Sequence, residues 1–186
     1  MSSSAVTLLG PDQAPLLARP YYERGDPGPI VAALAQVPEL LEVALPFIGT
    51  VLGPSALDWR TKELVIVRVS ALMECRFCVN AHTAVALDAG LSRAEILALH
   101  GKASLDAIID PAERAMLAWV DAVACGPGPV EPTVLAGLRP HFAEHEIVEL
   151  TLLVGATLML NRFATALRLP TDTAVLRRLE TEDLLP

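Results

Sequence analysis

Aromatic residues are scarce in this sequence. Phe, Trp and Tyr make up 4% of the 186 residues, although 53% of the residues are hydrophobic. A core of this composition must be built from Ala, Leu and Val, which favours closely packed helices over a sheet. No segment alternates apolar and polar residues as a half-buried strand does. We therefore predict an all-α protein, folded as a single-domain helical bundle.

Clusters of basic residues are also missing. Asp and Glu number 22 against 14 Lys and Arg, which gives a formal net charge of -8. Because a nucleic-acid surface needs Lys and Arg to neutralise phosphates, this balance argues against nucleic acid as a partner.

The sequence shows neither a signal peptide nor a long apolar segment. Its N-terminus lacks a basic stretch followed by an apolar run. The longest apolar stretch, residues 150–160, contains Thr and Gly and is shorter than the ~20 residues that span a membrane. We expect a cytoplasmic protein without a membrane partner.

Pro, Gly and capping residues divide the chain into an arm and a helical domain. Residues 1–29 are rich in Pro and Gly and lack a steady period, so we expect an N-terminal arm on the surface or on a neighbouring subunit. Residues 30–186 are expected to form one helical domain. Helices are predicted at 30–36 and 38–51. One further helix is expected to begin after Asp58, and the next one to end at Gly90. Five more are predicted at 92–100, 111–125, 132–138, 144–169 and 172–179.

Residues 63–82, ELVIVRVSALMECRFCVNAH, carry the reactive side chains. Cys75 and Cys78 form a C-x-x-C, and His82 lies four residues beyond Cys78, which places them on one helix face. Glu63 precedes Cys75 by twelve residues. On an unbroken helix that separation is ~18 Å, so the chain must turn before Cys75 if Glu63 is to join the site.

A second stretch resembles the first at an offset of 86 residues. Residues 149–168, ELTLLVGATLMLNRFATALR, repeat several Glu, Leu, Met, Arg and Phe positions of residues 63–82. This similarity predicts an internally duplicated two-helix unit with a pseudo-twofold axis. In the second copy Asn, Ala and Arg replace the two cysteines and the histidine.

The spacing of the two thiols suits the reduction of peroxides. A cysteine reacts as its thiolate, and the N-terminal end of a helix together with His82 favours Cys78 in that form. Cys78 is expected to attack the peroxide and become a sulfenic acid, which Cys75 resolves into a disulfide. Glu63 is expected to orient His82 or to relay a proton toward Cys75.

Two other functions stay open at this point. Cys75, Cys78, His82 and a carboxylate make four zinc ligands, although a second C-x-x-C or His pair is absent. A zinc-binding interaction module is therefore one alternative. The other is a disulfide reductase with vestigial peroxidase activity. No cofactor or metal is assigned, and Cys125 is expected to be a packing residue.

The combination of Glu63, Cys75, Cys78 and His82 resembles the signature of the alkylhydroperoxidase-D-like branch of the carboxymuconolactone decarboxylase family. This resemblance implies an all-helical, cysteine-dependent peroxidase for hydrogen peroxide or organic hydroperoxides. It implies that Cys78 is the peroxidatic thiol, Cys75 the resolving thiol, and Glu63 and His82 the proton relay. It also implies a homo-oligomer, namely a dimer, trimer or hexamer.

The electron donor implied by the resemblance is a dithiol. The best-studied members of the branch have a histidine inside the C-x-x-C, where this chain has Phe77. The identity of the dithiol is therefore left open.

Overall fold

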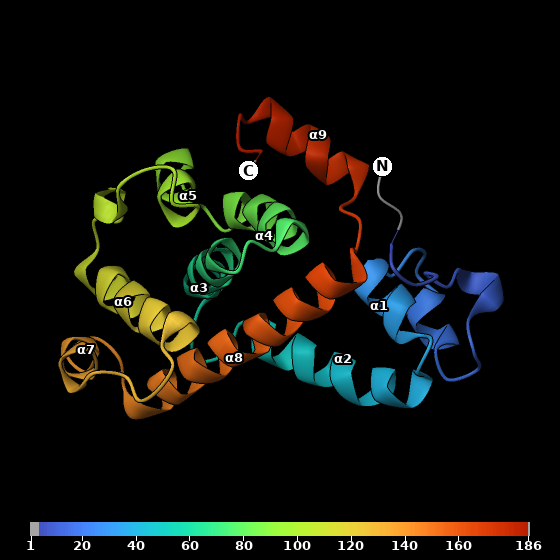
Figure 1. The fold of residues 1–186 in the computed structure, drawn as a ribbon, viewed down its shortest axis with the longest axis horizontal. Coiled ribbons are helices and arrows are strands. Elements are labelled where there is room, and N and C mark those ends of the chain that lie inside the picture. Colours follow the sequence, from blue (N-terminus) through green and yellow to red (C-terminus); the bar gives the residue numbers. More distant parts are fainter. Residues whose placement is uncertain (1–3, 186) are drawn as a thin grey trace.

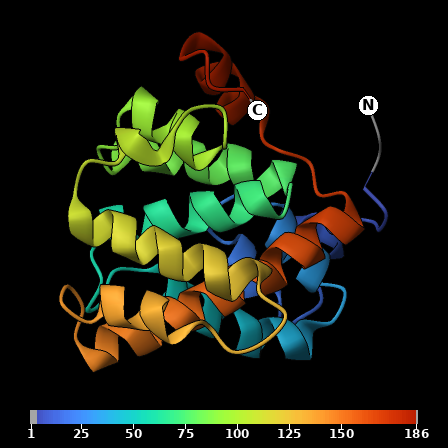
Figure 2. The ribbon, with the colours of Figure 1, turned by 60° about the vertical axis from the view of Figure 1, so that its left-hand side comes forward.

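A computed structural model describes residues 4–185, and within this range all regular secondary structure is helical, which confirms the all-α prediction. Figures 1 and 2 show the helices gathered around α3. The α-helices are α1 (Pro29–Leu34), α2 (Pro38–Leu52), α3 (Trp59–Leu72), α4 (Arg76–Asp88), α5 (Arg93–Leu99), α6 (Pro111–Cys125), α7 (Pro132–Leu138), α8 (Glu144–Leu167) and α9 (Thr173–Thr181). Short 3-10 turns lie at Pro11–Gln13, Arg19–Tyr22 and Leu105–Ala107.

Several helices begin at the polar residues that the sequence suggested as caps. The side chains of Asp58, Asp110 and Asp172 accept hydrogen bonds from backbone N–H groups in the first turns of α3, α6 and α9. Ser92 and Glu95 form a capping box at the start of α5. These contacts satisfy N–H groups that have no partner within the helix, so the local sequence fixes where each helix starts.

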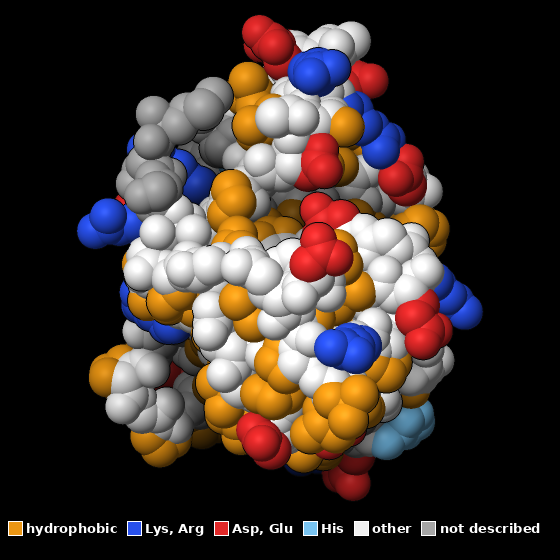
Figure 3. Space-filling model, turned by 90° about the vertical axis from the view of Figure 1, so that its right-hand side faces the viewer, with side chains coloured by type: hydrophobic (Ala, Val, Ile, Leu, Met, Phe, Trp, Pro, Cys, Tyr) orange, Lys and Arg blue, Asp and Glu red, His pale blue; other side chains and the backbone are white. Residues whose placement is uncertain are grey.

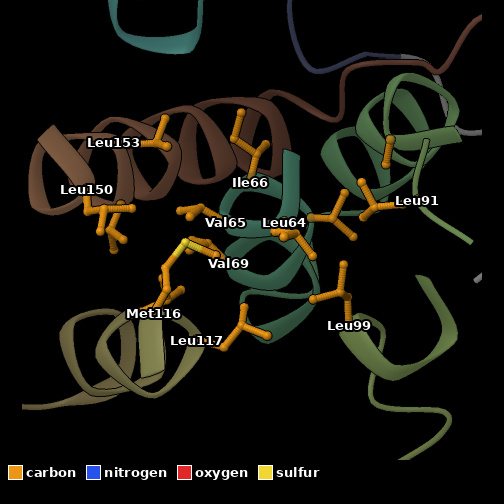
Figure 4. Packing of buried hydrophobic residues seen from close by; sticks show 14 of the residues in the cluster. Leu64, Val65, Ile66, Val69, Leu91, Leu99, Met116, Leu117, Leu150 and Leu153 are labelled. Atoms are coloured by element: carbon orange, nitrogen blue, oxygen red, sulfur yellow. The ribbon is translucent and has the colours of Figure 1, made fainter. Parts of the chain in front are cut away.

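The core of the protein surrounds α3. This helix packs against α4, α5, α6 and α8, and its apolar side chains are buried on more than one face. Figure 4 shows the core side chains of the four surrounding segments pointing toward it. Burying each such side chain contributes about 1.5–3 kcal/mol to folding. The labelled members are Leu64, Val65, Ile66, Val69, Leu91, Leu99, Met116, Leu117, Leu150 and Leu153.

The longest helix, α8, combines a buried face with an exposed apolar one. By length and composition it is the one helix within residues 4–185 that is apolar enough to cross a membrane. It packs against α2, α3, α4 and α6 instead, so many of its apolar side chains belong to the core. Val148, Leu152 and Met159 remain exposed on its outer side.

The predicted duplication is wrong in one respect, because the second copy is not a two-helix unit. Residues 149–168 belong to α8, which continues without a break until Arg168 adopts a left-handed conformation. Residues 63–82 instead contain the end of α3, a turn and most of α4. At the buried Leu160 α8 stays helical, whereas the aligned residue of the first copy is the exposed Glu74, which follows the end of α3.

The N-terminal arm lies on α1 and on the end of α8, and its residues 1–3 fall outside the described range. The backbone N–H of Ala5 donates to the carbonyl of Leu167 (2.8 Å), and that of Leu9 donates to Ala32 (3.1 Å). The buried Tyr22 donates its hydroxyl hydrogen to the carbonyl of Leu9 (2.8 Å). These bonds hold the arm against the same side of the molecule as the C-x-x-C.

Candidate active site

A tight turn between α3 and α4 places the C-x-x-C at the start of a helix. The backbone N–H of Cys75 donates to the carbonyl of Ser70 (3.0 Å), and that of Glu74 donates to Ala71 (3.1 Å). Glu74 is left-handed, with φ of 52°. This bonding pattern closes the end of a helix, although the left-handed conformation costs a non-glycine residue about 1–2 kcal/mol. The turn that the sequence required before Cys75 is therefore present.

The two thiols lie side by side in the interior. Cys75 is fully buried and Cys78 is 4% exposed. Their Sγ atoms are 2.7 Å apart, and both cysteines are free. A disulfide has an S–S distance of about 2.05 Å, so a small shift of the side chains is enough to form the bond.

The negative charge of this pair belongs on Cys75. As the N-cap of α4, its Sγ accepts a hydrogen bond from the backbone N–H of Cys78 (3.4 Å). The hydrogen bond from the Cys78 thiol is the largest cause that lowers the pKa of Cys75, to about 6, against the opposing effect of burial. The hydrogen bond to Cys75 and burial raise the pKa of Cys78.

The sequence-based expectation assigned the effect of the helix N-terminus to Cys78. The helix N-terminus acts on the residue at the N-cap, which is Cys75, because that side chain faces the free N–H groups of the first turn. Cys78 lies inside the first turn, where it contributes its backbone N–H to Cys75. At neutral pH the two sulfurs therefore share one proton through their hydrogen bond.

Glu63 and His82 form the polar pair beside the thiols. His82 Nδ1 lies 3.0 Å from Glu63 Oε2 and 3.3 Å from Oε1. Glu63 comes from α3 and is buried, whereas His82 comes from α4 and is partly exposed. The prediction that Glu63 approaches His82 after a turn is confirmed. A buried carboxylate in this position fixes the orientation of the imidazole ring.

Two polar side chains of α8 complete the surroundings of the sulfurs. Asn161 is 1% exposed, its Nδ2 donates to Ser70 Oγ (3.1 Å), and its amide favours the thiolate of Cys78 by hydrogen bonding. Thr165 acts in the same way on Cys75. Sequence reasoning identified neither as a site residue. The available signal for Asn161 was the presence of an amide within an apolar helix, at the position that aligns with Cys75.

Apolar side chains from distant parts of the chain cover the thiols. They come from the arm, α1, the start of α4 and the end of α8. Figure 3 views the molecule from this side and shows hydrophobic side chains across the face. The cluster around the two cysteines contains Val6, Leu8, Ile30, Ala33, Phe77, Phe163, Ala164, Leu167 and Leu169.

Neither a metal site nor Cys125 adds to the candidate active site. Within residues 4–185, no three His, Cys, Asp or Glu side chains lie close enough together to hold a metal ion. Cys125 is exposed at the end of α6, so its expected packing role is wrong. Cys125 is the last residue of α6, and Gly126 is the C-cap of this helix.

Comparisons with known proteins agree with this structure. Residues 38–122 match the carboxymuconolactone decarboxylase family. The uncharacterised protein YdfG of Bacillus subtilis is 30% identical over 114 residues, which cover 61% of this chain and 77% of that protein. The uncharacterised protein YnjA of Escherichia coli is 25% identical over 162 residues, which cover 84% and 88% of the two chains.

Solved structures share the fold. A protein of unknown function from Agrobacterium tumefaciens, suggested to be an AhpD antioxidant defence protein, is 28% identical with a TM-score of 0.68 and covers 76% of this chain and 96% of its own. A peroxidase-related protein from Ralstonia eutropha with an alkylhydroperoxidase AhpD core has a TM-score of 0.81 at 20% identity, covering 92% and 94%.

The fold also occurs with a different activity. The debrominase Bmp8, solved with 2,3,4-tribromopyrrole, has a TM-score of 0.74 at 18% identity and covers 96% of this chain and 99% of its own. Fold alone therefore does not decide the reaction. The family match, the relatives and the helical architecture together show that this chain belongs to the carboxymuconolactone decarboxylase family and has the AhpD-like fold.

Proposed function

We propose that this protein is a cysteine-dependent peroxidase that reduces hydrogen peroxide or organic hydroperoxides through a Cys75–Cys78 disulfide. The main support is the thiol pair itself, with its sulfurs 2.7 Å apart and one thiolate held at the N-cap of α4. The Glu63–His82 pair supplies acid–base chemistry beside it.

In this proposal Cys78 is the attacking residue, because it is the less buried of the two sulfurs and its proton has an acceptor in Cys75. The proton shared by the two sulfurs stays on Cys75 as the Cys78 sulfur attacks the terminal oxygen of the hydroperoxide. The S–O bond forms as the O–O bond breaks, which leaves a sulfenic acid on Cys78. The departing alkoxide takes a proton from His82 and leaves as the alcohol.

The second step forms the disulfide. Cys75 gives its proton to His82 and attacks the sulfur of Cys78. The S–S bond forms, the S–O bond breaks, and the hydroxide leaves as water with the proton from His82. The overall change consumes two thiols and one hydroperoxide and releases one alcohol and one water. A dithiol in the cytoplasm then reduces the disulfide and restores both thiols.

Peroxide turnover by purified variants tests this function. With dithiothreitol as reductant, the wild-type protein is expected to consume cumene hydroperoxide, and Cys78→Ser to fall to the rate of dithiothreitol alone. Cys125→Ser is the matched control and should keep the full rate, because Cys125 lies outside the site. Persistent turnover in Cys78→Ser would contradict the proposal.

Chemical trapping tests the roles of the two cysteines. In Cys75→Ser the sulfenic acid on Cys78 has no resolving thiol, so dimedone should label Cys78 after one equivalent of hydroperoxide. Equal labelling of Cys75 in the Cys78→Ser protein would reverse the assigned roles.

A disulfide reductase is the second candidate, and the position of the charge supports it. The lowered pKa belongs to the first cysteine of the C-x-x-C, at a helix N-terminus, which suits attack on a disulfide. The two functions are separated by comparing the second-order rate constants for a hydroperoxide and for a small aromatic disulfide. A rate with hydroperoxide near that of free dithiothreitol, together with fast disulfide reduction, would favour the reductase.

We also propose that the protein forms a homo-oligomer through an apolar face on α2 and α8. These helices contact each other, and the exposed residues of α8 recur at intervals of four, three and four, which suits packing against a helix of a second copy. Light scattering should give a multiple of the monomer mass, which Leu152→Lys should reduce. A monomeric wild-type protein would contradict this proposal. The face comprises Val43, Phe47, Val148, Leu152, Gly155 and Met159.

A further inference from the structure

Asn161 has an amide oxygen that no group in the thiol form of the site uses. Its side chain is 1% exposed, and its Nδ2 is fixed by the hydrogen bond to Ser70 Oγ at 3.1 Å. Its Oδ1 is buried and has no hydrogen-bond partner. Nearly all buried polar atoms in native proteins are paired, so an unpaired acceptor beside a reactive centre requires an explanation.

The position of Asn161 links this acceptor to the thiols. α8 packs directly on both α3 and α4, the two helices whose junction carries the C-x-x-C. Ala164, almost one turn beyond Asn161, belongs to the apolar cluster that contains Cys75 and Cys78. A hydrogen bond from the Asn161 side chain is among the influences that lower the pKa of Cys78, which associates this amide with the Cys78 sulfur. The oxygen that Cys78 gains on oxidation is therefore formed next to an amide whose orientation Ser70 already fixes.

We propose that Asn161 is a positioning residue that holds the sulfenic acid of Cys78 and directs it toward disulfide formation. This inference rests on the proposed peroxidase function. In the thiol form Oδ1 has no donor. Oxidation places an O–H group on the Cys78 sulfur, and that O–H donates to Asn161 Oδ1.

The hydrogen bond matters because two reactions compete for the sulfenic acid. In the productive reaction the Cys75 sulfur, 2.7 Å away in the thiol form, attacks the Cys78 sulfur, the S–S bond forms, and the S–O bond breaks to give water. In the competing reaction the sulfenic sulfur attacks a second hydroperoxide and becomes a sulfinic acid, with release of a second alcohol. Fixing the S–O bond against Asn161 leaves the sulfur facing its resolving partner, which favours the disulfide.

The test is the partition between disulfide and sulfinic acid. Reduced wild-type and Asn161→Leu proteins are treated with increasing cumene hydroperoxide in the absence of reductant, and both products at Cys78 are quantified by mass spectrometry. We expect the disulfide-to-sulfinic ratio of Asn161→Leu to fall roughly two- to tenfold, the range that a single neutral hydrogen bond supplies. A purely structural role for Asn161 would lower the folding stability without changing this ratio.

Asn80 provides the matched control. It is also an asparagine, 7% exposed, with a buried Oδ1 that has no partner, but its Nδ2 donates to Thr171 Oγ1 (3.2 Å). Asn80→Leu therefore removes an equally buried amide that the two sulfurs do not use, and should leave the ratio unchanged. Asn161→Ala serves as a second variant if Asn161→Leu does not fold, and the same direction of change is expected.

The outcomes separate this inference from the function on which it rests. A wild-type protein whose thiols do not react with hydroperoxide overturns both. A wild-type protein that forms the disulfide, with the same ratio in Asn161→Leu or Asn161→Ala, overturns the role of Asn161 alone. An equal fall of the ratio in Asn80→Leu also overturns it, because the effect then follows from loosened packing.

Discussion

Residues 63–82 and 149–168 have similar patterns of residues, but they fold differently. The first stretch ends α3 at Leu72, turns at the left-handed Glu74 and begins α4 at Arg76. The second continues as α8. The difference shows that one turn assembles the candidate site, because the turn places two cysteines at a helix N-terminus and brings a histidine back to Glu63.

Because of this turn, the aligned residues Glu63 and Glu149 have different partners. Glu63 reaches His82 Nδ1 at 3.0 Å because the chain reverses between them. In the straight α8, the position that aligns with His82 lies nineteen residues from Glu149, roughly 28 Å along the axis. Glu149 instead pairs with Lys62 Nζ at 2.8 Å and accepts a hydrogen bond from Ser55. One carboxylate supports chemistry, and the other joins α8 to α3.

The largest expected effect concerns activity. Glu63→Gln removes the group that orients and charge-balances His82, so kcat/KM for cumene hydroperoxide should fall by ~10²-fold or more. Glu149→Gln is the matched control at the aligned position and should keep most of the activity. Equal activity losses in the two variants would show that the carboxylates do not differ in role.

For folding stability we expect the opposite order, with the larger loss in Glu149→Gln. Lys62 is fully buried, so Glu149→Gln leaves a buried ammonium without its counter-charge and should lower the free energy of unfolding by about 3 kcal/mol. This lies at the low end for such changes because Lys62 still donates to the carbonyls of Val51 and Gly53. Urea unfolding of both variants measures it. A larger loss of unfolding free energy in Glu63→Gln than in Glu149→Gln would contradict the different roles assigned to the two carboxylates.

The sequence predicted most of the helices and the approach of Glu63 to His82, because caps, Pro–Gly breaks and the spacing of Glu63, Cys75, Cys78 and His82 are local signals. It failed at the second copy, where the local pattern of apolar residues was the same. Leu160, which aligns with the exposed Glu74, is buried against the rest of the fold within the continuous α8. Tertiary packing of this kind is not visible in a periodic pattern.

The sequence did not reveal that Cys75 is the N-cap of α4. Which residue becomes the N-cap depends on where the preceding helix ends, and a shift of a few residues transfers the effect of the helix N-terminus between Cys75 and Cys78. The end of α3 is set by the hydrogen bond from the Cys75 N–H to the carbonyl of Ser70. The contribution of Asn161 depends on long-range packing and could not be read from local spacing.

The pH dependence of stability tests the assignment of charge. Because the pKa of Cys75 is lowered from 9.0 to about 6, the folded state of the reduced protein holds fewer protons than the unfolded state between these values. This contribution to stability is complete above pH 9 and is lost as the pH falls through about 6. The raised pKa of Cys78 opposes it only above pH 9.

Urea unfolding of reduced wild-type and Cys75→Ser proteins across this range measures the difference. The stability advantage of the wild type over Cys75→Ser should grow with pH between about 6 and 9. Cys125→Ser should follow the wild type at every pH. An advantage that shrinks with rising pH would place the thiolate elsewhere.

The smallest effect concerns the turn itself. Glu74→Gly removes the cost of a left-handed glutamate and should stabilise the protein by about 1 kcal/mol. Arg162→Gly, at the exposed surface of the continuous α8 and outside the proposed oligomer face, should destabilise it by about 1 kcal/mol, because glycine disfavours a helix interior. Thermal unfolding measures both. Effects of the same sign would mean that the turn is not the local difference between the two stretches.

The most direct measurement is the mass of the reduced wild-type protein after one equivalent of cumene hydroperoxide. If residues 63–82 are the redox site, the intact mass falls by about 2 Da, and peptide mapping locates a Cys75–Cys78 disulfide while Cys125 stays a free thiol. An unchanged mass, or oxidation confined to Cys125, would contradict the central claim that the turn before Cys75 makes this stretch reactive.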